Sequence, residues 1–493
     1  MAEENYSEQE LIRIEKLKEL RSKNINPYPS TFEKTHNIGE LQEKYKDLEN
    51  GVELEETAQI TGRVMAWRTG GKVSFVDIKD DSGKMQLFVS INQLGQEVYE
   101  DLRLFDMGDI IGAFGKIKRT KRGELSIAVE KITLLSKALR PLPEKFHGLK
   151  DTETKYRKRY LDLIMNNDTK ELFRKRSLFV KEMRNFMDSK GFMEVETPMM
   201  ELVPGGADAR PFVTHHNALD LDLYLRISLE LHLKRLIIGD YEKVYEVGRV
   251  FRNEGMSTQH LQEFTLMEFY WAYADYNMLM ELTEEMYTYL MEKVFGTLKF
   301  EYQGETLDFT RPWKRIDYRE VILEKTGIDL DLYPTVESLI PVLREKGIVP
   351  DVKLGRGRLI DQLFKKFARP QLIQPSFLIN HPLDISPLAK QHENNPNYVQ
   401  RFQVLFAGAE VGNAFTELND PIDQKARFEE QGKLRDLGDD EAQRMDEEFI
   451  QALEHGMPPT GGFGVGIDRF FAILANVETI RDVVFFPTMR PLD

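Results

Sequence analysis

The sequence contains no cysteine among its 493 residues. This absence excludes disulfides, thiolate zinc sites and a cysteine nucleophile, and it is compatible with a reducing compartment. No stretch approaches the roughly 20 consecutive apolar residues of a membrane-spanning helix. The first residues, MAEENYSEQELIRIEKLKEL, lack the apolar core of a secretory signal. We therefore expect a soluble, cytoplasmic protein that does not contact a membrane.

Positive charge is also in short supply. The 67 basic residues are outnumbered by 82 acidic ones, which gives a net charge of −15. Taken alone, this balance argues against a nucleic-acid partner, because phosphate contacts need Lys and Arg. Charge acts locally, however, within a screening length of about 10 Å. Two basic clusters, at 116–122 and 155–159, therefore keep such a partner open, although both are also compatible with ordinary solvated surface.

The length predicts two or three domains. Residues 1–56 read as an N-terminal helical extension with an amphipathic helix at 7–23. Residues 57–142 are rich in short strand patterns. The remainder, 150–493, mixes helical and strand patterns, and about 325–375 reads as a helical insertion between two strand-rich blocks.

The strand-rich segment predicts a small β-barrel. Its expected strands are Ala58–Trp67, Lys72–Lys79, Lys84–Ser90, Asp109–Lys118 and Leu125–Leu135. The OB-fold is the favoured architecture, with an SH3-like barrel as the alternative. OB-folds often bind single-stranded nucleic acid through aromatic stacking. Phe75 lies on one expected strand, and Gln86 and Phe88 share a face of the next, although a Phe in a strand is more often a core residue.

A first chemical block at 244–271 has the pattern strand, loop, strand. In its second strand the bulkier face carries Thr265, Met267, Phe269 and Trp271, which we expect to face the core. The alternate face then directs Phe264, Glu268 and Tyr270 into a cleft.

The same block suits ATP. Arg252 ends the first strand, Glu254 opens the loop and His260 lies within it. A guanidinium can fork onto phosphate, a histidine can donate to it, and a Phe face can carry adenine. The alternative is a surface hairpin with an Arg–Glu pair, and the aromatic and acidic face behind the loop favours a site.

A second block at 401–424 carries carboxylates. Gly408 allows a turn between two strands. Glu410 and Glu417 are seven residues apart and would point opposite ways on a regular strand, so a bulge or helical turn must intervene if both serve one site. Asn413 shares a face with Glu417. Carboxylates near a nucleotide suggest Mg²⁺, and an acidic surface rim is the alternative.

A third block, GGFGVGIDRF at 461–470, is glycine-rich. It is neither a P-loop nor a Rossmann turn, because no GK[ST] follows and it does not open a βαβ unit. We interpret Gly462, Gly464 and Gly466 as marking close backbone approach. Arg469 then projects from the start of a helix and would supply, with Arg252, a second phosphate clamp.

In this order the blocks resemble motifs 1 to 3 of the class II aminoacyl-tRNA synthetases. Motif 1 corresponds to a helix at 168–189 and a strand at 192–197 that ends at Pro198, motif 2 to 251–268, and motif 3 to 462–474. Two segments, PGGADARPF (204–212) and NAFTELNDPIDQ (413–424), resemble the lysine-specific, bacterial-type branch in particular. The resemblance extends from about residue 50 to 490.

The resemblance implies an α+β protein. An N-terminal OB-fold barrel would bind the anticodon, and a catalytic domain would be built on an antiparallel β-sheet flanked by helices. The implied activity is ATP- and Mg²⁺-dependent activation of L-lysine followed by transfer to tRNA(Lys). The family works as a homodimer through motif 1, and the helix at 168–189 has apolar residues for that role: Leu172, Phe179, Met183 and Phe186.

Residue roles follow from the same resemblance. The implied ATP-binding residues are Arg252, Glu254, His260, Phe264, Glu410 and Arg469, of which Arg252 and Arg469 are catalytic and Glu410 also holds metal. The implied lysine-binding residues are Gly206, Glu230, Arg252, Glu268, Tyr270, Asn413 and Glu417. In the barrel, Phe75 and Gln86 match the family's anticodon contacts.

The chain departs from the family at two places. Gln403 stands where a Glu is usual seven residues before Glu410, and Leu261-Gln262 replaces the usual Asn-Pro after His260. Three alternatives stay open. They are an aspartyl- or asparaginyl-type synthetase, a paralogue that lysylates a protein, and a non-catalytic RNA-binding paralogue. The acids of the cleft weigh against the first alternative, the presence of the barrel weighs against the second, and the intact arginines weigh against the third.

Overall fold

The structure is a computed structural model that describes residues 6–143, 151–255, 257–350, 355–439 and 441–491. Residues 1–5 of the expected N-terminal extension, the expected domain start at 150 and residues 351–354 of the expected insertion lie outside this range. The chain divides into two compact units, 1–150 and 151–493. No helix among the described residues is both long and apolar enough to cross a membrane.

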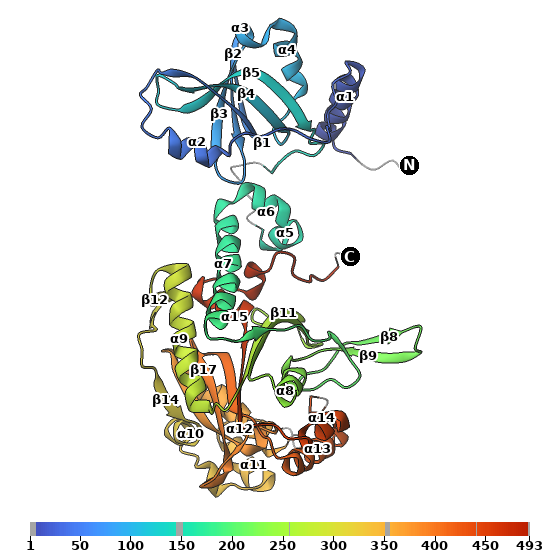
Figure 1. Cartoon of the computed structure of the whole chain (residues 1–493), viewed down its shortest axis with the longest axis vertical. Coiled ribbons are helices and arrows are strands. Elements are labelled where there is room, and N and C mark those ends of the chain that lie inside the picture. The colour runs from blue at the N-terminus through green and yellow to red at the C-terminus, as the bar shows by residue number, and fades with distance from the viewer. Residues whose placement is uncertain (1–5, 144–150, 256, 351–354, 440, 492–493) are drawn as a thin grey trace. The chain divides into compact units, whose positions relative to one another are not determined.

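The first unit is a closed five-stranded barrel (Figure 1). Its strands are β1 (Glu53–Gly70), β2 (Val73–Lys79), β3 (Lys84–Ser90), β4 (Ile110–Arg119) and β5 (Leu125–Ser136). They close in the order β1-β2-β3-β5-β4, with β3 and β5 parallel and the other pairs antiparallel. This is a small Greek-key barrel, which confirms the OB-fold expectation. Helix α1 (Glu8–Ser22) begins at a capping box on Ser7.

Strand alternation puts the barrel's predicted binding residues on its outer face. On β2, Val76 and Ile78 are buried in the barrel core. Phe75 is the neighbour of Val76 on this strand and therefore points to the opposite, outer side. On β3, Gln86 and Phe88 likewise face outward. The Phe75 and Phe88 rings meet edge to face at 5.7 Å, each partly exposed. Phe75 is therefore not a core residue.

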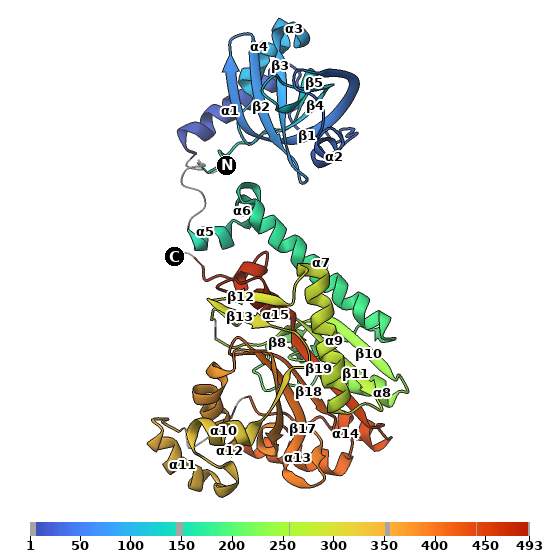
Figure 2. The same cartoon turned by 90° about the vertical axis from the view of Figure 1, so that its left-hand side faces the viewer.

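The second unit is built on a nine-stranded mixed sheet (Figures 1 and 2). The strands run in the order β14 (Lys314–Asp317), β15 (Ser376–Pro382), β17 (Asn395–Phe406), β18 (Ala409–Thr416), β19 (Thr460–Gly466), β11 (Glu263–Ala272), β10 (Lys243–Phe251) and β6 (Met193–Glu194), with β16 (Gln391–His392) beside β17. All pairs are antiparallel except the parallel pairs at the two edges, β14–β15 and β10–β6. The strand expected at 192–197 is therefore only two residues long.

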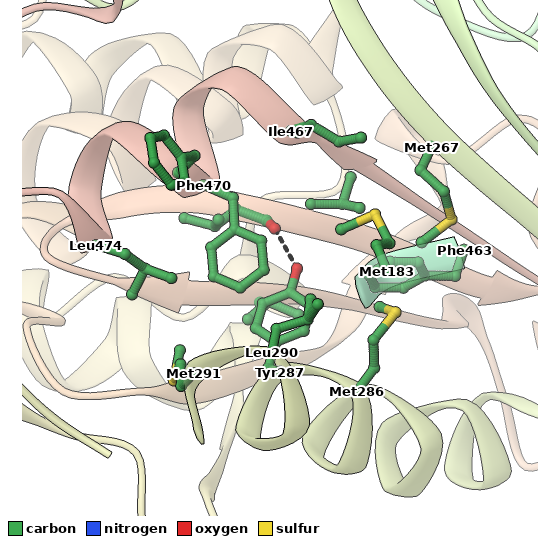
Figure 3. Packing of buried hydrophobic residues seen from close by; sticks show 14 of the residues in the cluster. Met183, Met267, Met286, Tyr287, Leu290, Met291, Phe463, Ile467, Phe470 and Leu474 are labelled. Carbon is green, nitrogen blue, oxygen red and sulfur yellow. Dashed lines mark hydrogen bonds between the residues drawn. The ribbon is translucent and has the colours of Figure 1, made fainter. Parts of the chain in front are cut away.

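One face of this sheet packs against three helices and forms the main core (Figure 3). The helices are α7 (Asn167–Ser189), α9 (Tyr276–Phe295) and α15 (Ile467–Leu474). Met267 and Phe269 of β11 enter this core, as the sequence predicts. On α9, the Tyr287 hydroxyl donates to the Val411 carbonyl at 2.5 Å, which ties the helix to β18. The prediction that this side of β11 faces the core is thus confirmed.

The same core corrects one expectation. Phe179, Met183 and Phe186 of α7 are almost fully buried within the chain's own core, and Leu172 packs against it. Phe179, Met183 and Phe186 therefore stabilise the fold and are not available to a second subunit, whereas Leu172 is only partly buried. Their 3–4 residue spacing marks a helix face that must be covered, but it does not say by what.

The opposite face of the sheet is covered only at its two ends. At one end lie α8 (Glu230–Ile238), α13 (Pro421–Asp436) and α14 (Glu447–Glu454). At the other end lie α10 (Tyr318–Thr326), α11 (Val336–Glu345) and α12 (Arg356–Leu363), which form a separate apolar cluster in the predicted helical region. The central strands β17, β18, β19 and β11 are left to floor a cleft between these groups of helices. A three-stranded sheet of β7 (Met200–Glu201), β9 (Leu221–Leu225) and β8 (Val213–His216) stands apart.

Candidate functional site

The cleft holds a cavity of about 930 Å³. Every residue predicted to bind the amino acid lines it: Gly206, Glu230, Arg252, Glu268, Tyr270, Asn413 and Glu417. These residues come from α8, β11, β18 and the loops beside them, so the fold brings together positions that are more than 200 residues apart in the chain. The other predicted ATP residues, Glu254, His260, Phe264, Glu410 and Arg469, lie outside the lining of this cavity.

The floor of the cleft is flat because its middle strand carries glycines. On β19, Gly464 pairs with Glu268 on one side and with Asn413 on the other. Gly462 pairs with Tyr270 on β11 and lies under Glu417. A Cβ on Gly462 would lie 2.0 Å from Glu417 Oε1, a distance no atom pair tolerates. The glycines therefore let side chains from two flanking strands meet above the third, as the close-approach interpretation predicts.

A bulge brings the two acids of the second block to one face. The pairing of β17 with β18 shifts by one residue where Gly412 opposes Val404 but Glu410 opposes Leu405. Val411 is the extra residue. Glu410 consequently faces the same side as Asn413, which a regular strand would not allow. The sequence argument that a bulge or turn must intervene is confirmed.

Glu268 is a buried carboxyl that, among the described residues, has three hydrogen-bond donors and no cationic partner. Its Oε1 accepts from the Ser228 hydroxyl at 2.7 Å and the Leu229 amide at 3.1 Å, and its Oε2 accepts from the Tyr270 hydroxyl at 3.0 Å. Burial, reinforced by the charge of Glu230, raises the pKa of Glu268 to about 7, against the pull of these hydrogen bonds. A cation entering the cavity would reverse that shift.

Glu230 and Glu417 are buried on either side of a lysine that sequence reasoning missed. Lys234 Nζ lies 2.5 Å from Glu230 Oε1 and forms an ion pair with Glu417 Oε2. Burial raises the pKa of both carboxyls, and the ammonium counteracts it. Although burial disfavours its charge, the two carboxylates raise the pKa of Lys234. Glu417 Oε1 is left without a hydrogen-bond partner.

Gly206 closes the cavity next to Glu230. Its φ of +83° lies in the left-handed region, and a Cβ there would meet the Glu230 Cβ at 2.9 Å. Its amide donates to Gln443 Oε1 at 3.2 Å, and Gln443 in turn donates to Asp208 at 3.3 Å. The loop at 204–212 is thereby held over the cavity by the segment between α13 and α14.

Arg252 links the cavity to the predicted nucleotide residues. It follows β10 directly, and its Nε donates to the Ile227 carbonyl at 3.3 Å. Its guanidinium lies 5.1 Å from the centre of the half-buried Phe264 ring. The Phe264 ring therefore makes a cation–π contact with Arg252. A further aromatic ring can join a stack of this kind.

The remaining predicted nucleotide residues cluster electrostatically around Arg469, in the first turn of α15. Its Nη1 donates to the Glu410 carbonyl at 3.1 Å, while its Nε has no partner. Burial lowers the pKa of Arg469, and the charges of Glu410, Arg252 and Glu254 act on it. The pKa of His260 is lowered by burial and then by the charge of Arg469. A polyanion would compensate these desolvated cations.

Metal-binding groups are sparse. Across the described residues, no group of three or more His, Asp or Glu side chains could hold a metal ion. Glu410 is the carboxylate at the predicted position, and Gln403, which pairs with Asn413 across β17 and β18, lies on the same face of the sheet. One carboxylate and one amide fit a Mg²⁺ ion that takes its other oxygens from phosphate and water.

Three further site residues escaped sequence reasoning: Ser228, Lys234 and Arg401. Arg401 Nε donates to Asn413 Oδ1 at 2.9 Å, and its Nη1 donates to the Ile385 carbonyl at 2.6 Å, so it orients Asn413. Lys234 had a readable signal, its i,i+4 spacing from Glu230 on a helix. Ser228 and Arg401 had none, because their partners are 40 and 12 residues away on other strands.

Comparison with known proteins agrees with this geometry. Residues 151–490 match the family described as "tRNA synthetases class II (D, K and N)", and residues 58–135 match "OB-fold nucleic acid binding domain". The chain is 50% identical over 480 residues to a lysine–tRNA ligase of Moorella thermoacetica, covering 97% of each chain. It is 48% identical to one from Pelotomaculum thermopropionicum, covering 99% of this chain and 96% of the relative. For one from Carboxydothermus hydrogenoformans the identity is 49%, over 98% of each.

The raised pKa of Glu268 predicts a pH-dependent stability. The pKa of Glu268 is about 7 in the folded protein against an ordinary value of 4.5, so the contribution of this group to stability is lost as pH rises from about 4.5 through 7. Glu268→Gln removes that loss. We expect the variant to gain on the order of 3 kcal/mol relative to the parent between pH 5 and pH 8.

The measurement is urea denaturation without substrates in a Trp67→Phe background, in which the two remaining tryptophans, Trp271 and Trp313, both report on the second unit. Substitution of the exposed Glu448 by Gln controls for loss of one acid. A stability difference that is the same at both pH values would contradict the prediction.

Proposed function

The chain belongs to the lysine–tRNA ligases of the class II tRNA synthetases, and we propose that it activates L-lysine with ATP and transfers it to the 3′ end of tRNA(Lys). The observation that carries this proposal is the set of three buried carboxylates, Glu230, Glu268 and Glu417, around one cavity. A lysine ε-ammonium leaving water needs such compensation. An aspartate or asparagine side chain would instead leave these acids unpaired or repelled, which disfavours the aspartyl- and asparaginyl-type alternatives.

The residue assignments that we propose keep the predicted roles. Glu230 and Gly206 would receive the α-ammonium, and Glu268, Tyr270 and Glu417 the ε-ammonium. Asn413, held by Arg401, would lie beside the substrate carboxylate with Arg252. Arg252 would also hold the α-phosphate. This arrangement is supported by the fact that each of these amino-acid residues lines the same cavity.

On the nucleotide side, Arg469, Glu254, His260, Phe264 and Glu410 would hold ATP. The lysine carboxylate would attack the α-phosphorus in line, releasing pyrophosphate and forming lysyl-adenylate, and a ribose hydroxyl of tRNA would then displace AMP. No nucleophilic side chain is needed. Arg252 and Arg469 would act by holding the reactants in line and by balancing negative charge that develops on phosphate oxygens.

We propose Mg²⁺ as the cofactor, held by Glu410 with Gln403 nearby. When bound, Mg²⁺ neutralises phosphate charge and orients the triphosphate. With one carboxylate and one amide at the proposed metal position, rather than two carboxylates, the chain would bind the ion more weakly than a two-Glu site. Glu410 would supply the charge, and Gln403 an amide oxygen.

For the barrel unit, residues 57–142, we propose anticodon binding through Phe75 and Gln86. Both lie on the outer face, where the Phe75 ring is partly exposed and Gln86 Oε1 accepts from the Ser126 hydroxyl at 3.2 Å. The neighbouring Phe88 carries Lys118 Nζ 4.3 Å from its ring centre. Stacking surface and positive charge together suit single-stranded RNA. Residues 1–56 would be its N-terminal extension.

We further propose that the protein is a cytoplasmic homodimer. With the α7 residues committed to the core, the surface that would serve is the run of exposed large apolar side chains before and within the small three-stranded sheet. These side chains are Met193, Met199, Met200, Leu202, Val213, Leu219 and Leu221. An apolar patch of this kind is typical of an obligate interface.

Amino-acid-dependent ATP–pyrophosphate exchange tests the activation step. With Mg²⁺ and each of the twenty amino acids in turn, we expect exchange with lysine alone, because only lysine brings an ε-ammonium of matching length and charge. Exchange with aspartate or asparagine would overturn the assignment of the acidic pocket. No exchange with any amino acid would favour a non-catalytic RNA-binding role.

Phe75→Ala tests the barrel. Loss of one base stack is worth about 1–3 kcal/mol, so kcat/KM for charging tRNA(Lys) should fall roughly 5- to 150-fold. Lysine-dependent pyrophosphate exchange should stay at the parent rate, because it involves no tRNA. Met107→Ala, at another exposed apolar position of the same unit, should change neither rate. Equal losses in charging and exchange would show that Phe75 serves the fold and not tRNA binding.

Gln403→Glu tests the metal assignment. A second carboxylate beside Glu410 should lower the Mg²⁺ concentration needed for half-maximal binding of a non-hydrolysable ATP analogue, because Mg²⁺ prefers charged oxygen ligands. Calorimetric titration of the analogue across Mg²⁺ concentrations measures this. Gln403→Ala should shift the midpoint the other way or leave it in place. An unchanged midpoint for Gln403→Glu would place the ion away from this residue.

A further inference from the structure

Lys234 is a fully buried cation in a pocket of carboxylates. It lies one helical turn after Glu230 on α8, and its side chain is 0% exposed. Its Nζ bridges Glu230 and Glu417. The rings of Phe415 and Phe449 lie 5.5 and 5.9 Å from it, centre to nitrogen. These surroundings exclude water, so the ammonium acts on both carboxylates in a medium of low dielectric constant.

Lys234 does not satisfy the pocket. Glu417 Oε1 is buried without a hydrogen-bond partner, above Gly462. Glu268 is held by hydroxyl and amide donors alone. When all three carboxyls are ionised, they share one bridging ammonium, which leaves an excess of two negative charges. Lysine carries two ammonium groups, and its carboxylate would meet Arg252.

We propose that Lys234 is a positioning residue that keeps Glu230 and Glu417 ionised, so that the pocket is neutral only when the substrate supplies two ammonium groups. The inference rests on the proposed activation of lysine and names a determinant of its selectivity. A substrate with a neutral side chain leaves one buried carboxylate unpaired, which disfavours its binding in a desolvated site. Lys234 would impose this penalty without touching the substrate.

The alternative to ionisation is protonation. Burial raises the pKa of Glu230, and that of Glu417 well above its usual range, while the charge of Lys234 lowers both without cancelling the rise. The other titratable or charged groups that act on these carboxyls are Glu268 and Tyr270 on β11, Arg401 on β17 and Asp208 in the 204–212 loop. Without the ammonium, the carboxyls would take up protons from water. Lysine could then bind only by displacing them.

Counting the protons released on lysine binding tests this directly. Calorimetry at pH 7 in buffers of different ionisation enthalpy yields the number. For the parent protein we expect about half a proton, from Glu268 with its pKa of about 7. For Lys234→Met we expect lysine binding to release about one proton more than in the parent protein. The KM of this variant for lysine in pyrophosphate exchange should be about tenfold above the parent value at pH 7. This difference in KM should become smaller towards pH 8.5.

Two variants serve as controls. Lys137→Met removes an equally buried lysine that bridges Asp106 and Asp109 in the barrel unit, and it should leave the proton count at the parent value. Lys234→Arg keeps the charge and should restore the parent count and pH profile. A Lys234→Met variant with the parent proton count, and a KM raised equally at every pH, would mean that Lys234 only fills space.

The parent protein alone also decides the matter if Lys234→Met does not fold. Release of two or more protons at pH 7 would show that Glu230 and Glu417 are protonated despite Lys234, and would overturn the proposal. Failure of the parent to bind lysine, with ATP-analogue binding intact, would contradict the lysine activation on which the proposal rests. The two failures are therefore distinguishable.

Discussion

The cleft depends on a strand, β19, whose glycines leave the side that faces the cleft without side chains. Gly462 and Gly464 of β19 lie between β11 and β18, so that acidic side chains from both neighbours meet above the middle strand. A single Cβ on Gly462 would lie 2.0 Å from a carboxylate oxygen. The flat floor lets carboxylates from distant parts of the chain share one desolvated space, and sharing that space is what gives them unusual affinity for cations.

The two faces of the same sheet have opposite requirements. On the core face, bulky side chains such as Met267 and Phe269 are covered by α7, α9 and α15, and the tyrosine bond from α9 to Val411 fixes the helix next to the bulge. That bulge turns Glu410 towards the cleft. The direction in which Glu410 points is therefore linked to packing on the other side of the sheet.

Local patterns in the sequence predicted most of this. The five barrel strands and the two faces of β11 followed from period-two alternation and turn residues. The spacing of Glu410 and Glu417 required a bulge or a helical turn between them, and the structure shows which of the two it is and where it lies. Two predictions failed where the answer lay in distant partners. The strand at 192–197 is only two residues long, because it pairs briefly at a sheet edge. The apolar face of α7 is covered by the chain's own core, which a stripe of side chains alone cannot reveal.

The site divides into two regions of opposite charge, and Arg252 stands where they meet. On one side lie carboxylates whose pKa values burial raises, and on the other lies Arg469, whose pKa burial lowers. Each region is unfavourable without a ligand for the same reason, because each buries more charge of one sign than it can pair. A substrate pair with ammonium groups at one end and phosphates at the other would relieve both. Buried, unpaired charge of both signs is thus stored in a fold whose remaining core is apolar. The packing of that core supplies the free energy that keeps these charges buried. Binding of the two substrates would pair the charges and remove this cost.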